Sequence, residues 1–304
     1  MRNLLKIGFF ILTLLVINNM QGQSHIRLNN FWSNGFSLNP AAINDSYRNS
    51  VTIATRKQWL NFPGSPTYIY AAGTMYIEDY STQLGLKVMT ERKGYTQATD
   101  INAAYAYALS INRDLVINMG LTGSYQNFAY DRNMISVADD ENYSIYENLL
   151  FKNSFNASLG VEVLYKAVKF GYCSQNIFSA FNIENKLNFN TNLAYLFYKQ
   201  QSANVANMGI GISAFQYADF FQAEINGSFF YKADAQSNEL QLGLIYRTMY
   251  EVGAIAGIDF GKLRVSYSFD YNLGQVHNHS YGTHEIMFTY NFKPSRHCKT
   301  CRWY

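Results

Sequence analysis

Three histidines near the C-terminus have the residue type and spacing that most suggest a metal site. His277, His279 and His284 lie close together, and a spacing of two residues on a β-strand places both imidazoles on one face. The segment 273–281 is nevertheless expected to be a loop, and Glu285 is the only acid near these histidines. We therefore predict that the cluster binds no metal ion.

Two cysteines at the C-terminus have the spacing of a zinc or redox motif. Cys298 and Cys301 are separated by two residues, and His297 is the only further ligand nearby, whereas a structural zinc site takes four ligands. Redox catalysis by such a pair depends on a thioredoxin-like strand–helix–strand context, which the flanking sequence lacks. Because disulfides persist in oxidising compartments, we expect a small disulfide loop between Cys298 and Cys301.

The remaining acids and hydroxyls form no catalytic motif. The sequence contains neither G-x-S-x-G nor H-E-x-x-H, the patterns that position a serine nucleophile or a catalytic zinc ion in hydrolases. Asp139-Asp140-Glu141 offers oxygen ligands for a cation, but it lacks the EF-hand spacing and is expected to be a solvated loop tip. We therefore predict no catalytic residue and no cofactor.

The segments that carry these residues alternate like β-strands. At 101–126 the sequence is INAAYAYALSINRDLVINMGLTGSYQ, in which two alternating runs flank Asn112-Arg113-Asp114. A period of two indicates a strand, and three polar residues between two strands indicate a hairpin. The apolar face of this hairpin could contact either a protein core or lipid.

The same alternation recurs from residue 49 to residue 292, in fourteen runs. The runs are 49–59, 66–77, 82–91, 98–111, 114–127, 154–166, 168–176, 187–198, 204–215, 219–231, 239–248, 251–260, 262–272 and 282–292. Charged residues with the parity of the polar face are Lys87, Glu91, Glu162, Glu224, Arg264 and Asp270. We expect the runs to be strands and these charged side chains to pair across a wet interior.

Run length and composition distinguish three all-β folds. Strands of a soluble sandwich are mostly about five or six residues long, and a propeller repeats a blade motif. Here the runs are longer, the polar faces carry mainly Asn, Ser, Gly, Thr and Gln, and only 15% of residues are charged. A tilted strand that crosses a bilayer has about 9–11 residues. We predict an all-β fold, an antiparallel transmembrane β-barrel of the bacterial outer membrane with about 14 strands.

The beginning of the chain predicts export. Residues 1–22 have a basic start, an apolar run and a plausible cleavage point at Gly22, which is typical of a secretory signal peptide. Residues 23–48 would then form an N-terminal periplasmic leader or plug, 49–292 the barrel, and 293–304 a basic periplasmic tail. The charge of the remaining chain is close to neutral, so we expect no interaction with nucleic acid.

Connection lengths predict the orientation of the barrel. In outer-membrane barrels the periplasmic turns are short and the extracellular loops are longer. The tightest connections, at 112–114, Ala167 and Gly261, follow the fourth, sixth and twelfth runs, whereas the long connections 128–153 and 273–281 follow the fifth and thirteenth. We therefore expect odd-numbered strands to end at the cell surface and both chain termini to lie in the periplasm.

Short motifs add a resemblance to a known family. The sequence contains N-P-A at 39–41, R-K-Q-W at 56–59, P-G-S-P-T at 63–67 and T-H-E-I at 283–286. In this order, and with a signal peptide and a short cysteine-containing basic tail, the motifs resemble the PorP/SprF family of the type IX secretion system in Bacteroidetes.

The resemblance implies a non-catalytic outer-membrane barrel that anchors or helps display secreted, adhesin-like surface proteins, in some members for gliding motility. It also implies a periplasmic peptidoglycan-binding lipoprotein as a partner, in addition to outer-membrane lipid. The candidate partner-docking residues are Asn39, Pro40, Ala41, Arg56 and Trp59, although Arg56 has the parity of the interior and could pair with an acid there. The alternative function is a passive outer-membrane channel or small-molecule transporter, because a barrel of this size could hold a ligand.

Overall fold

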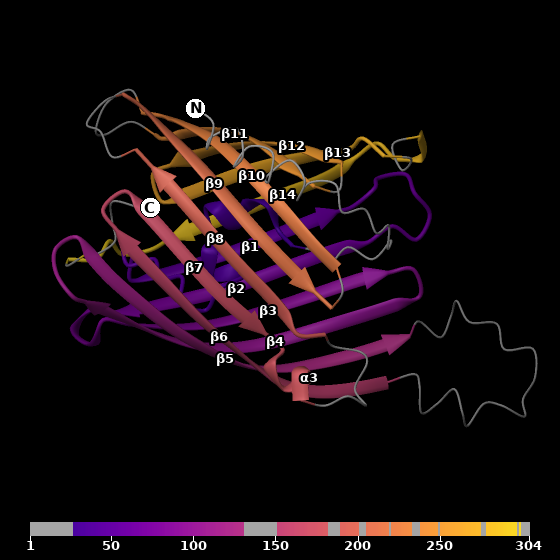
Figure 1. Ribbon diagram of the computed structural model, residues 1–304, viewed down its shortest axis with the longest axis horizontal. Helices are drawn as coiled ribbons and strands as arrows, with labels where there is room; N and C mark the ends of the chain where they lie inside the picture. The colour runs from indigo at the N-terminus through magenta and orange to yellow at the C-terminus, as the bar shows by residue number, and fades with distance from the viewer. Residues whose placement is uncertain are drawn as a thin grey trace, which may run out of the picture.

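Alternating strands in lipid must pair on both edges, because the bilayer offers no water to unpaired backbone groups. Here fourteen antiparallel strands, each next to its neighbour in sequence, close into one barrel when β1 pairs with β14 (Figure 1). The computed structural model describes residues 27–130, 151–181, 189–200, 205–218, 220–232, 238–248, 250–274, 278–296 and 298. The predicted architecture, a closed antiparallel β-barrel of fourteen strands, is confirmed.

Each predicted run overlaps one strand. The strands are β1 Asn49–Lys57, β2 Thr67–Ile77, β3 Thr82–Lys93, β4 Thr96–Ser110, β5 Leu115–Tyr130, β6 Phe151–Tyr165, β7 Val168–Gln175, β8 Thr191–Lys199, β9 Ala206–Tyr217, β10 Phe220–Tyr231, β11 Leu240–Arg247, β12 Glu251–Phe260, β13 Leu263–Asn272 and β14 Thr283–Asn291. Short helical turns are η1 Asn29–Trp32, η2 Gly35–Ser37, η3 Glu78–Tyr80 and α3 Ile177–Phe181. Among the residues described, no helix is long and apolar enough to cross a membrane.

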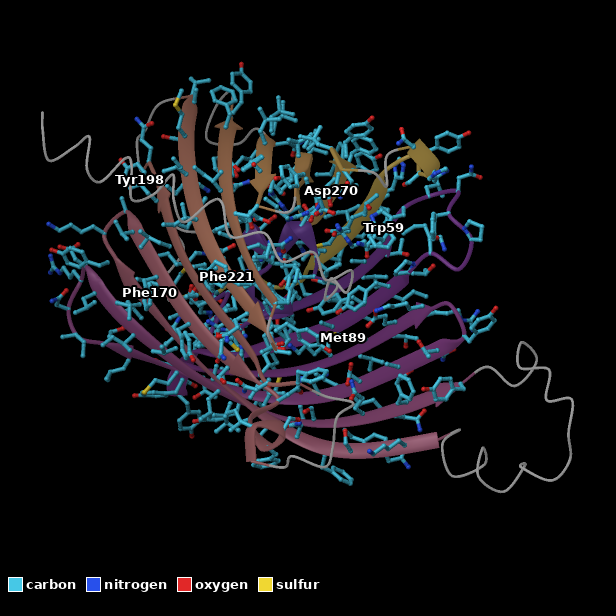
Figure 2. The ribbon with its side chains drawn as sticks, turned by 45° about the vertical axis from the view of Figure 1, so that its right-hand side comes forward. Trp59, Met89, Phe170, Tyr198, Phe221 and Asp270 are labelled. Atoms are coloured by element: carbon cyan, nitrogen blue, oxygen red, sulfur yellow. The ribbon has the colours of Figure 1, made fainter. Side chains whose placement is uncertain are left out.

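Side chains on the two faces of the strands differ in exposure, as the alternation predicts. In the hairpin of β4 and β5, Ile101 and Tyr105 are exposed on the outer face, whereas Ala104 and Ala106 are buried on the inner face. The side chains of Phe170, Tyr198 and Phe221 are likewise exposed on the outer wall (Figure 2). The apolar face at 101–126 therefore faces outward, toward lipid in an outer-membrane barrel.

The observed connections correct part of the prediction that short connections follow even-numbered strands. The turns after β4, β6 and β12 are short, as predicted, but the connections 94–95, 218–219 and 248–250, which follow β3, β9 and β11, are just as short. The three longest connections still follow odd strands, because β5, β7 and β13 precede them. We call the end of the barrel that carries these connections the long-loop end and the opposite end the short-turn end.

The N-terminal segment, defined here as residues 27–46, lies inside the barrel. All of η1 is buried, and the indigo start of the described chain lies between the front and back walls in Figure 1. The Asn29 backbone N–H donates to Glu285 near the long-loop end, and the Ser46 carbonyl accepts from Ser295 N–H at the short-turn end. The segment therefore passes through the lumen along most of its length.

Apolar side chains of the segment supply a large part of the barrel core. Phe31, Trp32 and Ile43 belong to one buried cluster with wall residues such as Tyr195 and Phe197. The Trp32 ring lies 5.5 Å from the Phe197 ring, centroid to centroid. Burial of such rings is strongly favourable, so hydrophobic packing holds the segment in place together with the polar contacts described below.

Several sequence-based predictions lie outside the described residues. They concern the signal peptide at 1–22, the acidic run Asp139-Asp140-Glu141, His277 and Cys301.

Candidate functional site

A group of buried charged side chains joins the N-terminal segment to the barrel wall near the long-loop end. We call it the ion-pair network, and its members are Arg27, Arg56, Arg247, Glu224, Asp270 and Glu285. The side chains of all six are at most 6% exposed. In Figure 2 Asp270 lies among nitrogen- and oxygen-bearing side chains inside the barrel. Because buried charges are costly unless paired, this arrangement depends on its internal pairing.

Arg247 is the centre of the network. It is the last residue of β11, and its Nε donates to Glu224 Oε2 at 2.6 Å, while its Nη1 donates to Asp270 Oδ2 at 3.1 Å. A third carboxylate, Glu251 of the next strand, lies 3.3 Å from Nη1. The planar guanidinium presents its donors in a fixed fork, so one side chain links β10, β12 and β13.

Arg56 makes the second link across the wall. Its Nη2 donates to Asp270 Oδ2 at 2.7 Å and its Nη1 donates to Glu285 Oε2 at 3.2 Å. Alternation had placed Arg56 and Asp270 on the interior face, and the structure pairs them. Arg56 therefore connects β1 with β13 and β14, close to where the barrel closes.

The N-terminal segment enters the network through Arg27 and η1. Arg27 Nη2 donates to Glu224 Oε2 at 2.5 Å, and Trp32 Nε1 donates to the other oxygen of Glu224 at 2.7 Å. Burial lowers the pKa of the Arg27 guanidinium by more than the charge of Glu224 raises it. An arginine nevertheless keeps its positive charge across the ordinary pH range. Glu224 is thus shared between the wall and the segment.

Glu285 holds the start of η1. The backbone N–H groups of Asn29 and Asn30 donate to its two carboxylate oxygens at 2.8 and 3.0 Å. These donors have no partner within a helical turn, so an acid at this position satisfies groups that would otherwise be buried and unpaired. The Asn29 side chain also donates to Asp270 at 2.8 Å and accepts from Arg247.

The candidate docking residues do not form one surface. Asn39, Pro40 and Ala41 are buried inside the barrel, Arg56 belongs to the ion-pair network, and Trp59 is partly exposed in the connection between β1 and β2. Trp59 adopts a φ of 49° and its ring lies 6.3 Å from the Phe62 ring. A role of these residues in partner docking stays a prediction.

The cysteines differ in their surroundings. Cys173 is free and buried in β7, whereas Cys298 is disulfide-bonded. The tail that carries Cys298 lies against the base of the N-terminal segment, since Ser295 N–H donates to the Ser46 carbonyl at 3.0 Å. Because Cys301 lies outside the described residues, its pairing with Cys298 stays a prediction.

Some members of the network were missed by sequence reasoning. Arg27, and Asn29 which is hydrogen-bonded to the network, precede the first strand, where no periodicity assigns an inner or outer face. Arg247 was identifiable, because it shares its parity with Gln241 and Ile245, which are buried on the inner face of β11. In the part of the chain that the structure describes, no group of His, Cys, Asp and Glu side chains is arranged to hold a metal ion.

A cavity of about 520 Å³ remains between the segment and the wall toward the short-turn end. The segment contributes Trp32 and Asn44 to its lining, and the wall contributes Lys199, Gln241 and Arg264. Its charged side chains are paired in part, since Arg264 lies 2.8 Å from Asp259 and Lys199 lies 3.8 Å from Glu239. The lumen is thus only partly filled, and its open part is on the side of the short turns.

One solved structure supports the fold. The monoaromatic hydrocarbon channel CymD is similar at a TM-score of 0.53 and 9% identity, with 90% of this chain and 95% of that chain covered. At this low identity the likeness to CymD supports the barrel fold alone. A FadL homologue of Pseudomonas aeruginosa has a TM-score of 0.49 and 10% identity over 84% of this chain and 93% of that one. Omp33 of Acinetobacter baumannii has a TM-score of 0.47 and 8% identity over 82% of this chain and 100% of that one.

The sequence itself assigns the chain to a family. No curated protein matches it, but residues 20–290 match the family model described as type IX secretion system membrane protein PorP/SprF. That match spans the N-terminal segment and nearly the whole barrel, and barrels of this kind occur in the bacterial outer membrane. The chain therefore belongs to the PorP/SprF family of type IX secretion system membrane proteins and is an outer-membrane β-barrel.

Proposed function

We propose that this barrel is a non-catalytic component of the type IX secretion machinery that anchors or helps display secreted surface proteins and links them to periplasmic components. Family membership supports the setting. The single observation that carries the proposal is the N-terminal segment, which lies in the lumen and is fastened to the wall by the buried Arg27–Glu224 ion pair and by hydrogen bonds to Glu285. A barrel filled in this way suits a scaffold better than a passive channel.

Affinity purification from envelopes of the native organism tests this role. With the tagged full-length protein as bait, we expect a secreted surface protein and a periplasmic lipoprotein to be recovered. An unrelated outer-membrane barrel with the same tag should recover neither. Absence of both partners from the native bait, with the barrel intact, contradicts the proposed function.

A substitution at the long-loop end tests whether the connection between β1 and β2 belongs to the docking surface. Phe62 is exposed beside Trp59 in the connection between β1 and β2, and Tyr95 is exposed in the turn between β3 and β4 at the same end. Because exposed aromatic residues often dominate interfaces, we expect Phe62→Ser to reduce recovery of the surface protein about tenfold. Tyr95→Ser, the matched control, should leave recovery unchanged. Equal recovery with both variants would remove this loop from the docking surface.

Conductance in planar bilayers distinguishes the proposed scaffold function from the alternative channel function. We expect the intact protein to show no stable open state, because the segment crosses the lumen and is bonded to the wall near the long-loop end. Glu285→Ala removes the acceptor of the Asn29 and Asn30 amides and should produce frequent openings. Glu91→Ala, on the inner face of β3, should not. Stable, large conductance of the unmodified protein would favour a channel or transporter instead.

A further inference from the structure

Part of the N-terminal segment fits the barrel wall as a peptide ligand fits its binding site. Three inward-facing glycines, Gly85, Gly120 and Gly160, leave room for it. A Cβ atom at Gly85 would overlap the Phe36 ring, and Cβ atoms at the other two would overlap Asn39-Pro40-Ala41. Gly120 and Gly160 lie directly opposite each other on β5 and β6. The glycines therefore leave room where the segment lies closest to this part of the wall.

Asn39 is the most completely bound residue of this stretch. Its side chain is fully buried, and its Nδ2 donates to the Val161 carbonyl and to the Tyr195 hydroxyl, both at 3.2 Å. Its Oδ1 accepts from the Ala41 N–H at 2.9 Å, which closes a turn of the kind that Asn side chains favour. Asn39 thus binds the wall and fixes the conformation of Pro40 at once.

Wall side chains also bind the backbone of the segment. Three backbone carbonyls, those of Ser37, Leu38 and Ala42, each accept a hydrogen bond from a different wall side chain, two on β3 and one on β7. The donors are Lys87 Nζ at 3.2 Å, Gln175 Nε2 at 2.6 Å and Gln83 Nε2 at 3.3 Å, respectively. Capture of the backbone by hydrogen bonds, with pockets for selected side chains, is the general mode of peptide recognition.

We propose that the inner wall formed by β3, β5, β6 and β7 is a recognition site for peptides of the type aromatic-x-x-Asn-Pro-Ala. The chain's own residues 36–41 occupy this site, which we call the luminal peptide site. A peptide with the same sequence, supplied by another molecule, competes for it. The proposal concerns contacts inside the barrel and does not rest on the anchoring role proposed above.

Binding of a synthetic peptide to the full-length protein in detergent micelles tests the proposal. The probe is a fluorescently labelled peptide with the sequence of residues 35–43, GFSLNPAAI. In the Asn39→Ala protein the internal competitor lacks the hydrogen bonds of the Asn39 side chain to the wall, so we expect this variant to bind the probe about tenfold more tightly than the native protein. A probe with Ala in place of its own Asn should bind about tenfold more weakly.

A second substitution locates the binding. In the Asn39→Ala protein, the further change Gly160→Leu fills the hollow that receives the Asn side chain and should abolish saturable binding. Should that variant fail to form a heat-stable barrel on electrophoresis, Lys87→Met, which removes the donor to Ser37, takes its place. No saturable binding to Asn39→Ala, or equal binding of the two probes, overturns the proposal. The proposal of a luminal peptide site does not depend on whether partners are recovered in the affinity purification.

Discussion

Replacement of Arg247 by Met is expected to lower the free energy of unfolding of the barrel by about 3–5 kcal/mol. Arg247 is buried and pairs with Glu224, Asp270 and Glu251. Met fills a similar volume but leaves these carboxylates with fewer positive partners, and an unpaired charge in a buried site costs more than the pair itself contributes. The measurement is equilibrium unfolding in urea, with the protein in lipid vesicles and the transition followed by tryptophan fluorescence.

A matched control separates this effect from loss of any arginine. Arg92 is exposed at the end of β3 and donates to Gln97 across the turn. Because exposed contacts contribute little, we expect Arg92→Met to change the unfolding free energy by no more than about 0.5 kcal/mol. If the two variants lose the same stability, Arg247 is not part of a buried network.

Strand positions could be predicted from the sequence because inner and outer faces differ in chemistry at every second residue. The hairpin at 101–126 was predicted almost residue by residue, since lipid and lumen impose opposite demands on its two faces. The start of β8 was predicted too early, because the run 187–198 begins before the strand does at Thr191. There the Asn190 side chain donates to the Gln175 carbonyl, which takes the place of a ladder hydrogen bond.

The charged residues of the inner face show what strand alternation can predict and what it cannot. Parity identified Glu224 and Asp270 as interior residues, and both are buried in ion pairs. Parity could not identify their partners. Arg56 comes from a strand far away in sequence and Arg27 from the N-terminal segment, and parity does not set the register that places Arg247 opposite Glu224. Arg264, predicted on the same grounds, pairs instead with Asp259 on the adjacent strand and stays partly exposed.

The sequence offered a plug as one of two possibilities for the N-terminal segment, but the conformation of the segment escaped prediction for a physical reason. Its turns, η1 and η2, are short and carry neither a period of two nor a helical period. Their conformation is set by groups of the wall, such as Glu285 at the start of η1 and Gly85 beside Phe36. The motif N-P-A was noticed as a family signature, but its burial against Gly120 and Gly160 depends on a barrel that has already closed.

The outward orientation of the apolar faces predicts a second large effect. Met119 is 46% exposed on the outer face of β5, between the outward-facing Ile117 and Leu121. We expect Met119→Arg to destabilise the barrel in a lipid bilayer by about 2–4 kcal/mol, because a cation near the middle of the hydrocarbon region is poorly solvated. Equilibrium unfolding from vesicles measures this cost.

Ser124, on the same strand, provides the comparison that makes this experiment decisive. It lies opposite Asn102 and Asn156 in the ladders on either side of β5, and both of those side chains are on the buried inner face. An arginine at this position meets amide groups and water of the lumen rather than lipid, so Ser124→Arg should cost less than Met119→Arg. In detergent micelles, where water reaches the outer surface more readily, the difference between the two variants should shrink. Equal costs in the bilayer would mean that the outer face of β5 does not contact lipid.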